Sequence, residues 1–317
     1  MRTLFYGTPA HAVGFLELLA SRGELVAAVT QPDKPAGRGL REEPSPVKKR
    51  ALELGIPVLQ PPASSQVAEA IAPLRPDLAV AVAYGKLLKP DALAVPGLGT
   101  LNVHFSLLPK YRGAAPVQWS LVRGETRTGV TVFWLDEGMD TGPVFLRREL
   151  DIAPEEDAGG LLKRLTELGL EALGEALSDV KAGRIAREPQ SGEASFAPLI
   201  RREDARISLS RGAREIHDLA RGMRLWPRAF LNLDLPSGPL RVQVLKTRLP
   251  EPERPAAEPP PGTIVRVERG GGFLIQCGHS SRLWLLTVQP EGKKPVTAAD
   301  FLNGLRLAAG ALLPVKE

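Results

Sequence analysis

Cysteine and histidine are scarce in this sequence of 317 residues, which holds one cysteine and four histidines. A single cysteine, Cys277, cannot form a disulfide within the chain. The histidines, at positions 11, 104, 217 and 279, lie too far apart in the sequence to form a recognisable zinc-ligand pattern. The sequence therefore predicts a protein without an internal disulfide and without a bound metal.

Long apolar runs are also missing. No run approaches the roughly 20 residues that a membrane-spanning helix needs. The first residues, MRTLFYG, pass directly into a strand-like pattern, with no signal peptide ahead of it. Hydrophobic residues make up 43% of the chain and charged residues 24%, both ordinary for a globular protein. We therefore expect a cytoplasmic protein that does not associate with membranes, and we expect it to be a monomer.

Positive charge is distributed unevenly along the chain. Residues 1–205 hold 24 Lys+Arg against 26 Asp+Glu, whereas residues 206–317 hold 17 against 10, a net charge of +7. A solvated basic surface would account for this excess. Basic residues concentrated in one domain are also what binding to a phosphate backbone requires, because each neutralised phosphate releases counterions. Charge alone leaves both interpretations open.

The order of the expected elements predicts an α/β fold followed by a small β domain. A strand at 3–6, a helix and a strand at 25–29 form a βαβ unit, which indicates a parallel sheet. Gly7 stands alone where a dinucleotide-binding fold would carry G-x-G-x-x-G, so NAD binding is not expected. Further elements are expected as a long loop over 31–46, a helix opened by Ser45 and Pro46, a nearly apolar strand over 77–83, a long helix over 154–181, and short strands of a β-barrel over 240–245, 263–267, 272–276 and 282–287. The predicted domains are 1–189 and 206–317, joined by a linker at 190–205.

The stretch 101–116, LNVHFSLLPKYRGAAP, carries the most unusual arrangement of polar residues. Period-2 spacing in its strand-like first half places Asn102, His104 and Ser106 on one face. A Gly-rich turn with three carboxylates, DEGMDTGP, follows at 136–143. The chain contains only three asparagines, so one placed beside a histidine favours a functional role.

An amide, an imidazole and a nearby carboxylate have complementary uses in acyl transfer. Asn and His can donate hydrogen bonds to an oxygen that becomes negative as a carbonyl turns tetrahedral. A carboxylate can orient the imidazole, raise its pKa or handle a proton. Asp136 and Asp140 are the candidates for the carboxylate. The alternative is structural: Asn102 would cap the strand, His104 would be a half-buried core residue, and both aspartates would be turn formers.

Three motifs in combination resemble a known superfamily. Residues 102–109 and 112–116, with Asp140-Thr141-Gly142 downstream, resemble the signature of 10-formyltetrahydrofolate-dependent formyltransferases. The segments FYGTP at 5–9 and QPDKPAGRG at 31–39, together with the carboxy-terminal domain, extend the resemblance over nearly the whole chain, to the methionyl-tRNA formyltransferase family. This resemblance implies a Rossmann-like first domain, an OB-like β-barrel that binds tRNA, and initiator methionyl-tRNA as partner.

The resemblance also implies roles for particular residues. Asn102, His104 and Asp140 would be catalytic, with Asp140 chosen over Asp136 because the family pattern has an Asp just before Thr-Gly. The co-substrate 10-formyltetrahydrofolate would bind at residues 84–87 and 106–109, and the long loop would contact tRNA. In full, the co-substrate residues are Tyr84, Gly85, Lys86, Leu87, Ser106, Leu107, Leu108 and Pro109, and the tRNA residues are Arg38 and Arg41.

Two other functions remain open at this point. The same chemistry could formylate glycinamide ribonucleotide or an amino sugar, or hydrolyse the formyl-folate. The basic carboxy-terminal domain argues against this, since a small substrate needs no such partner. A tRNA-binding module without catalysis is the other possibility, but such a module has no use for Asn102, His104 and Asp140 together.

Overall fold

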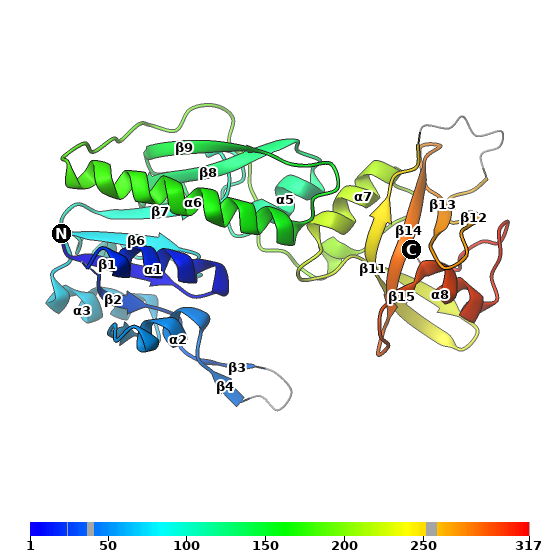
Figure 1. The fold of residues 1–317 in the computed structure, drawn as a ribbon, viewed down its shortest axis with the longest axis horizontal. Coiled ribbons are helices and arrows are strands. Elements are labelled where there is room, and N and C mark those ends of the chain that lie inside the picture. Colours follow the sequence, from blue (N-terminus) through cyan, green and yellow to red (C-terminus); the bar gives the residue numbers. More distant parts are fainter. Residues whose placement is uncertain (24, 37–40, 252–258, 317) are drawn as a thin grey trace. The chain divides into compact units, whose positions relative to one another are not determined.

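The computed structural model describes residues 1–23, 25–36, 41–251 and 259–316, which form two compact units (Figure 1). The first unit consists of Met1–Pro116, Arg127–Asp151 and Leu162–Pro198. The second unit takes in two short segments of the first half of the chain, so its three segments are Val117–Thr126, Ile152–Leu161 and Leu199–Glu317.

The first unit is an α/β structure with the element order of a Rossmann-like fold. Five of its strands, β5, β2, β1, β6 and β7, lie parallel and in that order, and β8 and β9 continue the sheet as antiparallel strands. Its elements are β1 (Thr3–Gly7), η1 (Ala10–Ala12), α1 (Val13–Ser21), β2 (Leu25–Val29), β3 (Lys34–Ala36), β4 (Arg41–Glu43), α2 (Pro46–Glu53), β5 (Val58–Leu59), η2 (Ser64–Gln66), α3 (Val67–Ile71), η3 (Ala72–Leu74), β6 (Leu78–Val82), α4 (Pro90–Leu93), β7 (Thr100–His104), β8 (Arg127–Trp134) and β9 (Val144–Asp151).

The strand order reverses beside β1, between β1 and β6. The chain runs from β1 outward to β2 and β5, and then returns to β6 on the other side of β1. In open α/β sheets, ligands bind at such a reversal. Here Thr8 donates a hydrogen bond to the Tyr84 carbonyl over 2.9 Å, and the Gln31 amide donates to the same oxygen over 2.9 Å. The segments that follow β1, β2 and β6 are therefore tied together at the edge where a ligand would enter.

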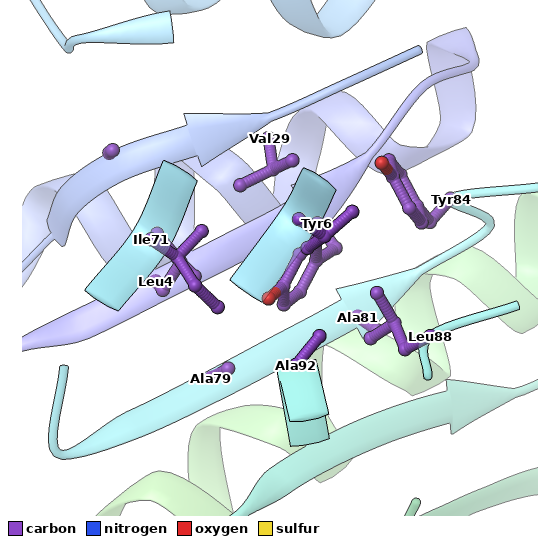
Figure 2. Close-up of a cluster of buried hydrophobic side chains, with 11 residues drawn as sticks. Leu4, Tyr6, Val29, Ile71, Ala79, Ala81, Tyr84, Leu88 and Ala92 are labelled. Carbon is purple, nitrogen blue, oxygen red and sulfur yellow. The ribbon is translucent and has the colours of Figure 1, made fainter. Parts of the chain in front are cut away.

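Alternate residues of the three central strands build the core on one face of the sheet (Figure 2). Leu4 and Tyr6 of β1 lie beside Val29 of β2 and Ala81 of β6, and Ile71 of α3 packs over them. All of these side chains are buried, and the alternate residues of β1 and β6 are buried on the other face, so both faces of these strands are covered. The core thus fixes the strands whose carboxyl ends lie at the reversal of strand order.

Helix α6 (Ala158–Lys181) lies against β7 at a glycine. A Cβ added at Gly169 would stand 3.0 Å from the Phe15 ring, 3.2 Å from Val103 and 3.4 Å from Phe105. A glycine inside a helix costs about 1 kcal/mol relative to alanine, and here it allows close packing. Val103 and Phe105 therefore face α6, which turns Asn102 and His104 to the opposite face of the sheet.

Local sequence signals explain where two helices begin. Ser45 caps α2 by accepting a hydrogen bond from the Lys48 amide over 3.1 Å, and Pro46 occupies the first turn, as expected. The long helix expected from residue 154 begins later, at Ala158. Its start is set by Asp157, whose carboxylate accepts from the amides of Gly159 and Gly160, both over 3.0 Å.

The long loop expected over 31–46 contains a short hairpin. Strands β3 and β4 pair antiparallel, with Lys34 opposite Glu43 and Ala36 opposite Arg41. The expectation of a loop throughout 31–46 was therefore wrong for Lys34–Ala36 and Arg41–Glu43, which are strands. Pro35 is compatible with pairing because the ribbon has only two strands, so each strand leaves one side unpaired.

The second unit is an antiparallel half-barrel of the OB-like type, confirming the fold class expected for this part of the chain. Its path runs β10, β11, β14, β13, β12, with β15 paired to β14. Its elements are α5 (Pro116–Val122, shared with the first unit), η4 (Glu203–Ala205), α7 (Ala213–Gly222), β10 (Phe230–Leu235), β11 (Gly238–Arg248), β12 (Ile264–Val267), β13 (Phe273–Gln276), β14 (Arg282–Pro290), β15 (Val296–Thr297) and α8 (Ala298–Leu305).

A buried ion pair on α7 joins the segments of the second unit. The Asp218 carboxylate accepts from Arg221 Nε over 2.8 Å, and Arg221 also donates to the Glu156 carbonyl over 3.3 Å. Asp218 and Arg221 are both buried, and His217 beside them contacts Thr247 over 2.9 Å. Burial lowers the pKa of His217, so this imidazole is favoured in its neutral form.

Removing one partner of this pair should destabilise the protein strongly. Asp218→Asn leaves the Arg221 guanidinium buried without its counter-ion, which typically costs about 3–5 kcal/mol of unfolding free energy. The double variant Asp218→Leu/Arg221→Met should lose less, because no buried charge is left unpaired. Urea unfolding measures both, with Asp234→Asn, at an exposed position of β10, as the control. A single variant as stable as the wild type would contradict a stabilising role for the pair.

Two features bear on ligand classes. No helix of the described residues is long and apolar enough to cross a membrane. Across the same ranges, no group of three or more His, Cys, Asp or Glu side chains is arranged to hold a metal ion.

Burial raises the pKa of Cys277 to about 12, which keeps this thiol protonated near neutral pH.

Candidate functional site

Strand β7 presents two polar side chains on one face at the centre of the sheet. Asn102 pairs with Ala81 of β6 on one side and with Phe133 of β8 on the other. His104, two residues on, shares the face of Asn102. The Asn102 side chain is half-buried, and its amide has no hydrogen-bond partner within the described residues. Its donor group is therefore available to a substrate.

The His104 ring is held by one backbone carbonyl. It is 6% exposed and its Nε2 lies 2.8 Å from the Tyr111 carbonyl oxygen. A carbonyl oxygen only accepts, so Nε2 carries the hydrogen and Nδ1 is directed elsewhere. Nδ1 lies 3.7 Å from Asp140 Oδ2, and Phe133 contacts the ring edge to face with 6.4 Å between centroids. The imidazole therefore has a fixed plane and a carboxylate beside its second nitrogen.

Asp140 is the carboxylate that reaches the histidine, and Asp136 is not. Asp140 Oδ2 accepts a hydrogen bond from the Gly113 amide over 2.7 Å, which ties the 136–143 turn to the loop after β7. The Asp136 carboxylate instead binds the Gly138 amide over 3.1 Å and the Thr141 hydroxyl over 2.7 Å, within its own turn. The structure therefore brings Asn102, His104 and Asp140 into one site and leaves Asp136 as a turn former.

Two glycines make this meeting of loops possible. A Cβ at Gly113 would stand 2.7 Å from the Ala197 carbonyl oxygen, and Gly113 has φ +117°, which disfavours other residues. A Cβ at Gly142 would stand 1.8 Å from the Trp134 carbonyl oxygen. Neither position can hold a larger residue without moving the backbone, and a shift there would carry Asp140 with it.

Residues 106–109, which are expected to contact the co-substrate, form a tight turn shortly after His104 in the chain. Ser106 is fully buried and donates to the Lys110 carbonyl over 2.6 Å. Thr131 of β8 donates to the Ser106 carbonyl over 2.7 Å and accepts from the Leu108 amide over 3.1 Å. Leu108 and Pro109 are buried and Leu107 is half-buried, so most of this segment contributes support and backbone groups.

Residues 84–87, also expected at the co-substrate, lie at the strand-order reversal. The Tyr84 side chain is buried in the core against Tyr6, with ring centroids 5.3 Å apart, and its carbonyl accepts the hydrogen bonds from Thr8 and Gln31. Burial raises the pKa of both phenols, which therefore stay neutral. The Lys86 ammonium donates hydrogen bonds to the Pro61 and Pro62 carbonyls over 3.1 and 3.0 Å. The other two residues of this segment are more open: Gly85 has a φ of +78°, and Leu87 is 64% exposed.

The two arginines expected to contact tRNA are not placed by the structure. Arg38 lies outside the described residues. Arg41 begins β4, and only its backbone is described. Their role stays a prediction from the sequence.

Residues 190–197, which follow α6, lie along the site. Their composition alone predicts a linker that begins at residue 190. Ser195 donates through its amide to the Pro109 carbonyl over 3.2 Å, and its hydroxyl accepts from the Tyr111 amide over 3.0 Å. Arg112 makes two backbone hydrogen bonds with this segment: its amide donates to the Ser195 carbonyl over 2.8 Å, and its carbonyl accepts from the Ala197 amide over 2.7 Å. Residues 190–197 are therefore part of the first unit and brace the loop that carries Gly113.

Gln190 was missed at the sequence level and connects both loops of the site. Its Oε1 accepts from Arg112 Nε over 3.2 Å and from Arg112 Nη2 over 2.6 Å. Its Nε2 donates to the carbonyls of Asp140 and Gly142 over 2.8 and 2.9 Å. Nothing in the sequence marks it, because it stands among Pro, Ser and Gly and no periodicity precedes it. Gln190 is a positioning residue for Asp140.

Replacing Gln190 by alanine should lower kcat by roughly 10- to 100-fold, since displacing a reacting group by about 1 Å can cost 100-fold. Gln190→Glu keeps the acceptor for Arg112 but cannot donate to the two carbonyls, so an intermediate loss is expected. Steady-state kinetics with the formyl donor and acceptor measure this, and the KM for the donor should change little. The exposed neighbour Ser191→Ala is the control. Full activity of Gln190→Ala would show that the hydrogen bonds from Gln190 are not needed to position Asp140.

The geometry suits stabilisation of a negatively charged oxygen at the outer face of β7. Asn102 offers a free amide donor, and His104 offers a fixed imidazole whose Nδ1 faces a carboxylate. Donors held rigidly in a partly buried site act more strongly than in water. The arrangement is that of acyl transfer to a nucleophile whose proton the carboxylate can accept.

Comparisons with known proteins agree with this chemistry. Residues 9–177 match the family described as Formyl transferase, and residues 199–306 match the family described as Formyl transferase, C-terminal domain. A protein of Sorangium cellulosum named methionyl-tRNA formyltransferase is 43% identical over 316 residues, 99% of each chain. A protein of the same name from Thermus thermophilus is 42% identical over 315 residues, again 99% of each chain.

Solved structures share the fold at low identity. A sugar 3N-formyltransferase, WlaRD, has a TM-score of 0.66 at 16% identity, covering 93% of this chain and 99% of that one. HypX from Aquifex aeolicus, solved with tetrahydrofolic acid, has a TM-score of 0.64 at 16% identity, covering 98% of this chain and 48% of that one. Identities this low support the fold alone, whereas the full-length sequence relatives define the family. The chain belongs to the formyl transferase family, within its methionyl-tRNA formyltransferase branch.

Proposed function

We propose that this protein transfers the formyl group of 10-formyltetrahydrofolate to the α-amino group of methionine esterified to initiator tRNA. The observation that carries the proposal is the grouping of Asn102, His104 and Asp140 at the centre of the sheet, in a chain that matches methionyl-tRNA formyltransferases over its full length. The reaction supplies the formylated methionine with which translation begins.

Each of the three side chains has a distinct role in the proposed reaction. The neutral amine attacks the formyl carbon, and the carbonyl oxygen becomes negative. Asn102 donates a hydrogen bond to this oxygen, and His104, as imidazolium, donates through Nδ1 because Nε2 is bound to Tyr111. Asp140 helps remove the amine proton, directly or through water. When the tetrahedral intermediate collapses, the bond between the formyl carbon and N10 of the folate breaks, and the proton passes to N10 as tetrahydrofolate leaves.

The formyl donor is proposed to bind where the strand order reverses. Residues 84–87 follow β6 at that reversal, and the buried Tyr84 side chain anchors this loop. The turn 106–109 would approach the donor from the β7 side. The Leu108 carbonyl has a partner already, Arg147 Nε at 3.0 Å, so this turn keeps its shape whether or not a ligand is bound.

The acceptor is proposed to be a tRNA because positive charge is concentrated in residues 206–317, which make up most of the second unit. Residues 206–317 carry a net charge of +7, and residues 1–205 carry −2. A small amine would gain nothing from a separate basic unit, whereas a polyanion would. All three catalytic groups come from one unit of one chain, so we propose that a monomer is active and that it works in the cytoplasm, where initiator tRNA is charged.

The substrate can be tested by offering the purified protein 10-formyltetrahydrofolate with one acceptor at a time. Charged initiator tRNA, glycinamide ribonucleotide and a nucleotide-linked amino sugar should give kcat/KM values that differ by several orders of magnitude in favour of the tRNA. Comparable or faster reaction of either small amine would reject the proposed acceptor. Free formate formed without an acceptor would indicate a hydrolase.

A further inference from the structure

A cavity of about 450 Å³ lies in the second unit, and none of the groups used in the chemistry above lines it. Its volume lies within the ~300–1,000 Å³ typical of small-ligand sites. Its lining comes from Arg202, which precedes η4, from residues 225–228 before β10, from the start of β10, from the middle of β11, and from the end of β14 with the two residues after it. All of these residues belong to one unit, so the cavity does not depend on any other part of the chain.

The floor of the cavity is a row of side chains across three strands. Phe230 of β10 pairs with Gln243 of β11, and Gln243 pairs with Gln289 of β14. Residues paired in this way point to the same face, and Arg241, two residues before Gln243, shares it. Val242 and Val244 point to the other face and are buried in the core. The polar row is therefore set by the alternation of β11.

Two arginines that line the cavity are held by neighbouring side chains. The guanidinium carbon of Arg241 lies over the Phe230 ring, 4.6 Å from its centroid, and its Nε is buried with no hydrogen-bond partner among the described residues. Because Nε is inaccessible, contact with a ligand would be made by the two terminal nitrogens of this guanidinium. Arg228 is fixed by the amide oxygens of Gln289, at 3.1 Å, and Gln243, at 3.4 Å.

An exposed tryptophan stands at the mouth of the same cavity. Trp226 is 63% exposed, although large aromatic side chains are usually buried, and the neighbouring Leu225 is 41% exposed. Exposed aromatic rings and flat guanidinium groups are the two kinds of surface on which unpaired bases stack. The lining carries three arginines against one acid, Glu291, which favours an anion.

We propose that this cavity binds one unpaired nucleotide of the tRNA, with its base on Trp226 and its phosphate on Arg241 and Arg228. The proposal rests on the proposed function for the identity of the RNA, and it goes further by naming the residues and the mode of contact. An unpaired nucleotide fits because a base inside a duplex cannot present its flat face to a side chain. The cavity then contributes to holding the substrate and takes no part in the transfer step.

The test measures tRNA affinity and turnover separately in the full-length protein. Trp226→Ala should raise both the Kd for uncharged tRNA and the KM for methionyl-tRNA by about 5- to 150-fold, the range for loss of one stacked base. Trp226→Phe should recover most of the loss, and kcat at saturation should stay at the wild-type value. Trp226 is largely exposed, so its truncation leaves no cavity in the core.

The arginines have a matched control in the same unit. Arg241→Gln should weaken tRNA binding and lower the slope of log Kd against log salt by about 1, as expected for one lost phosphate contact. Arg269→Gln makes the same charge change at an exposed turn outside the cavity and should have a much smaller effect. Equal losses for Arg241→Gln and Arg269→Gln would point to diffuse attraction by the basic surface and overturn the proposal.

A fully paired, blunt-ended RNA duplex separates stacking from general charge. The wild type should bind it through charge alone, so Trp226→Ala should leave its Kd unchanged while weakening tRNA. Equal weakening for both RNAs, or unchanged tRNA binding by Trp226→Ala, would overturn the proposal. If the wild type fails to formylate methionyl-tRNA, the proposed function fails, and the Kd measurements with uncharged tRNA still decide the cavity.

Discussion

Replacing Asn102 by alanine is expected to slow formyl transfer by about 10²–10³-fold, the usual cost of losing one donor to a developing oxyanion. Asn102 is suited to this role because it lies at the centre of the sheet, paired on both sides, and its amide has no partner within the described residues. The alanine variant removes the donor and leaves the β7 backbone pairing intact. The fall should appear in kcat, with little change in the KM for the formyl donor.

Two controls make the Asn102 result specific. Asn102→Asp keeps the shape of the side chain but replaces the donor by an acceptor and adds a charge, so it should be at least as slow as the alanine variant. Asn232→Ala, in β10 of the second unit, removes an amide elsewhere and should leave kcat at the wild-type value. Turnover of Asn102→Ala within a few-fold of the wild type would rule out the oxyanion role.

Asp140→Asn is expected to lower kcat by about 10²–10⁴-fold, the usual range for a positioned acid–base group. The asparagine can still accept the Gly113 amide hydrogen bond, so the turn should keep its position. It loses the negative charge 3.7 Å from His104 Nδ1 and the group that receives the amine proton. The variant therefore separates charge from structure at a site where both loops meet.

The matched control for Asp140 is four residues earlier in the same turn. Asp136→Asn removes the same charge from the same turn. Among the described residues, the Asp136 carboxylate accepts hydrogen bonds from Gly138 and Thr141. It should retain nearly full kcat. If both variants lost the same activity, general electrostatics of the turn would explain the result, and Asp140 would have no specific role.

Residues close in the sequence could be placed in advance, because strand and helix periods decide which side chains share a face. The period-2 pattern put Asn102 and His104 together, and β7 has that geometry. Ser45 and Pro46 marked the start of α2 correctly. These features depend on local rules that need no knowledge of the rest of the fold.

Features that depend on distant segments could not be derived from local patterns. The choice of Asp140 over Asp136 depended on the family resemblance, because both aspartates stand in turn-forming sequence. Gln190 braces the site through contacts to residues 78 and 50 positions earlier in the chain. Its Pro/Ser/Gly surroundings indicate a linker by composition, and only tertiary packing turns that segment into part of the site. The cavity beside Trp226 was equally hidden, since its floor is assembled from three strands.

The most direct test of the central claim follows a labelled formyl group through a single turnover. Wild-type protein in excess would be given 10-formyltetrahydrofolate labelled in the formyl carbon together with charged initiator tRNA, and the tRNA, the free amino acid pool and formate would be separated. The account predicts one label per tRNA, on the α-amino group of its methionine, with one tetrahydrofolate released for each. Label recovered as formate, or elsewhere than on that amine, would contradict it.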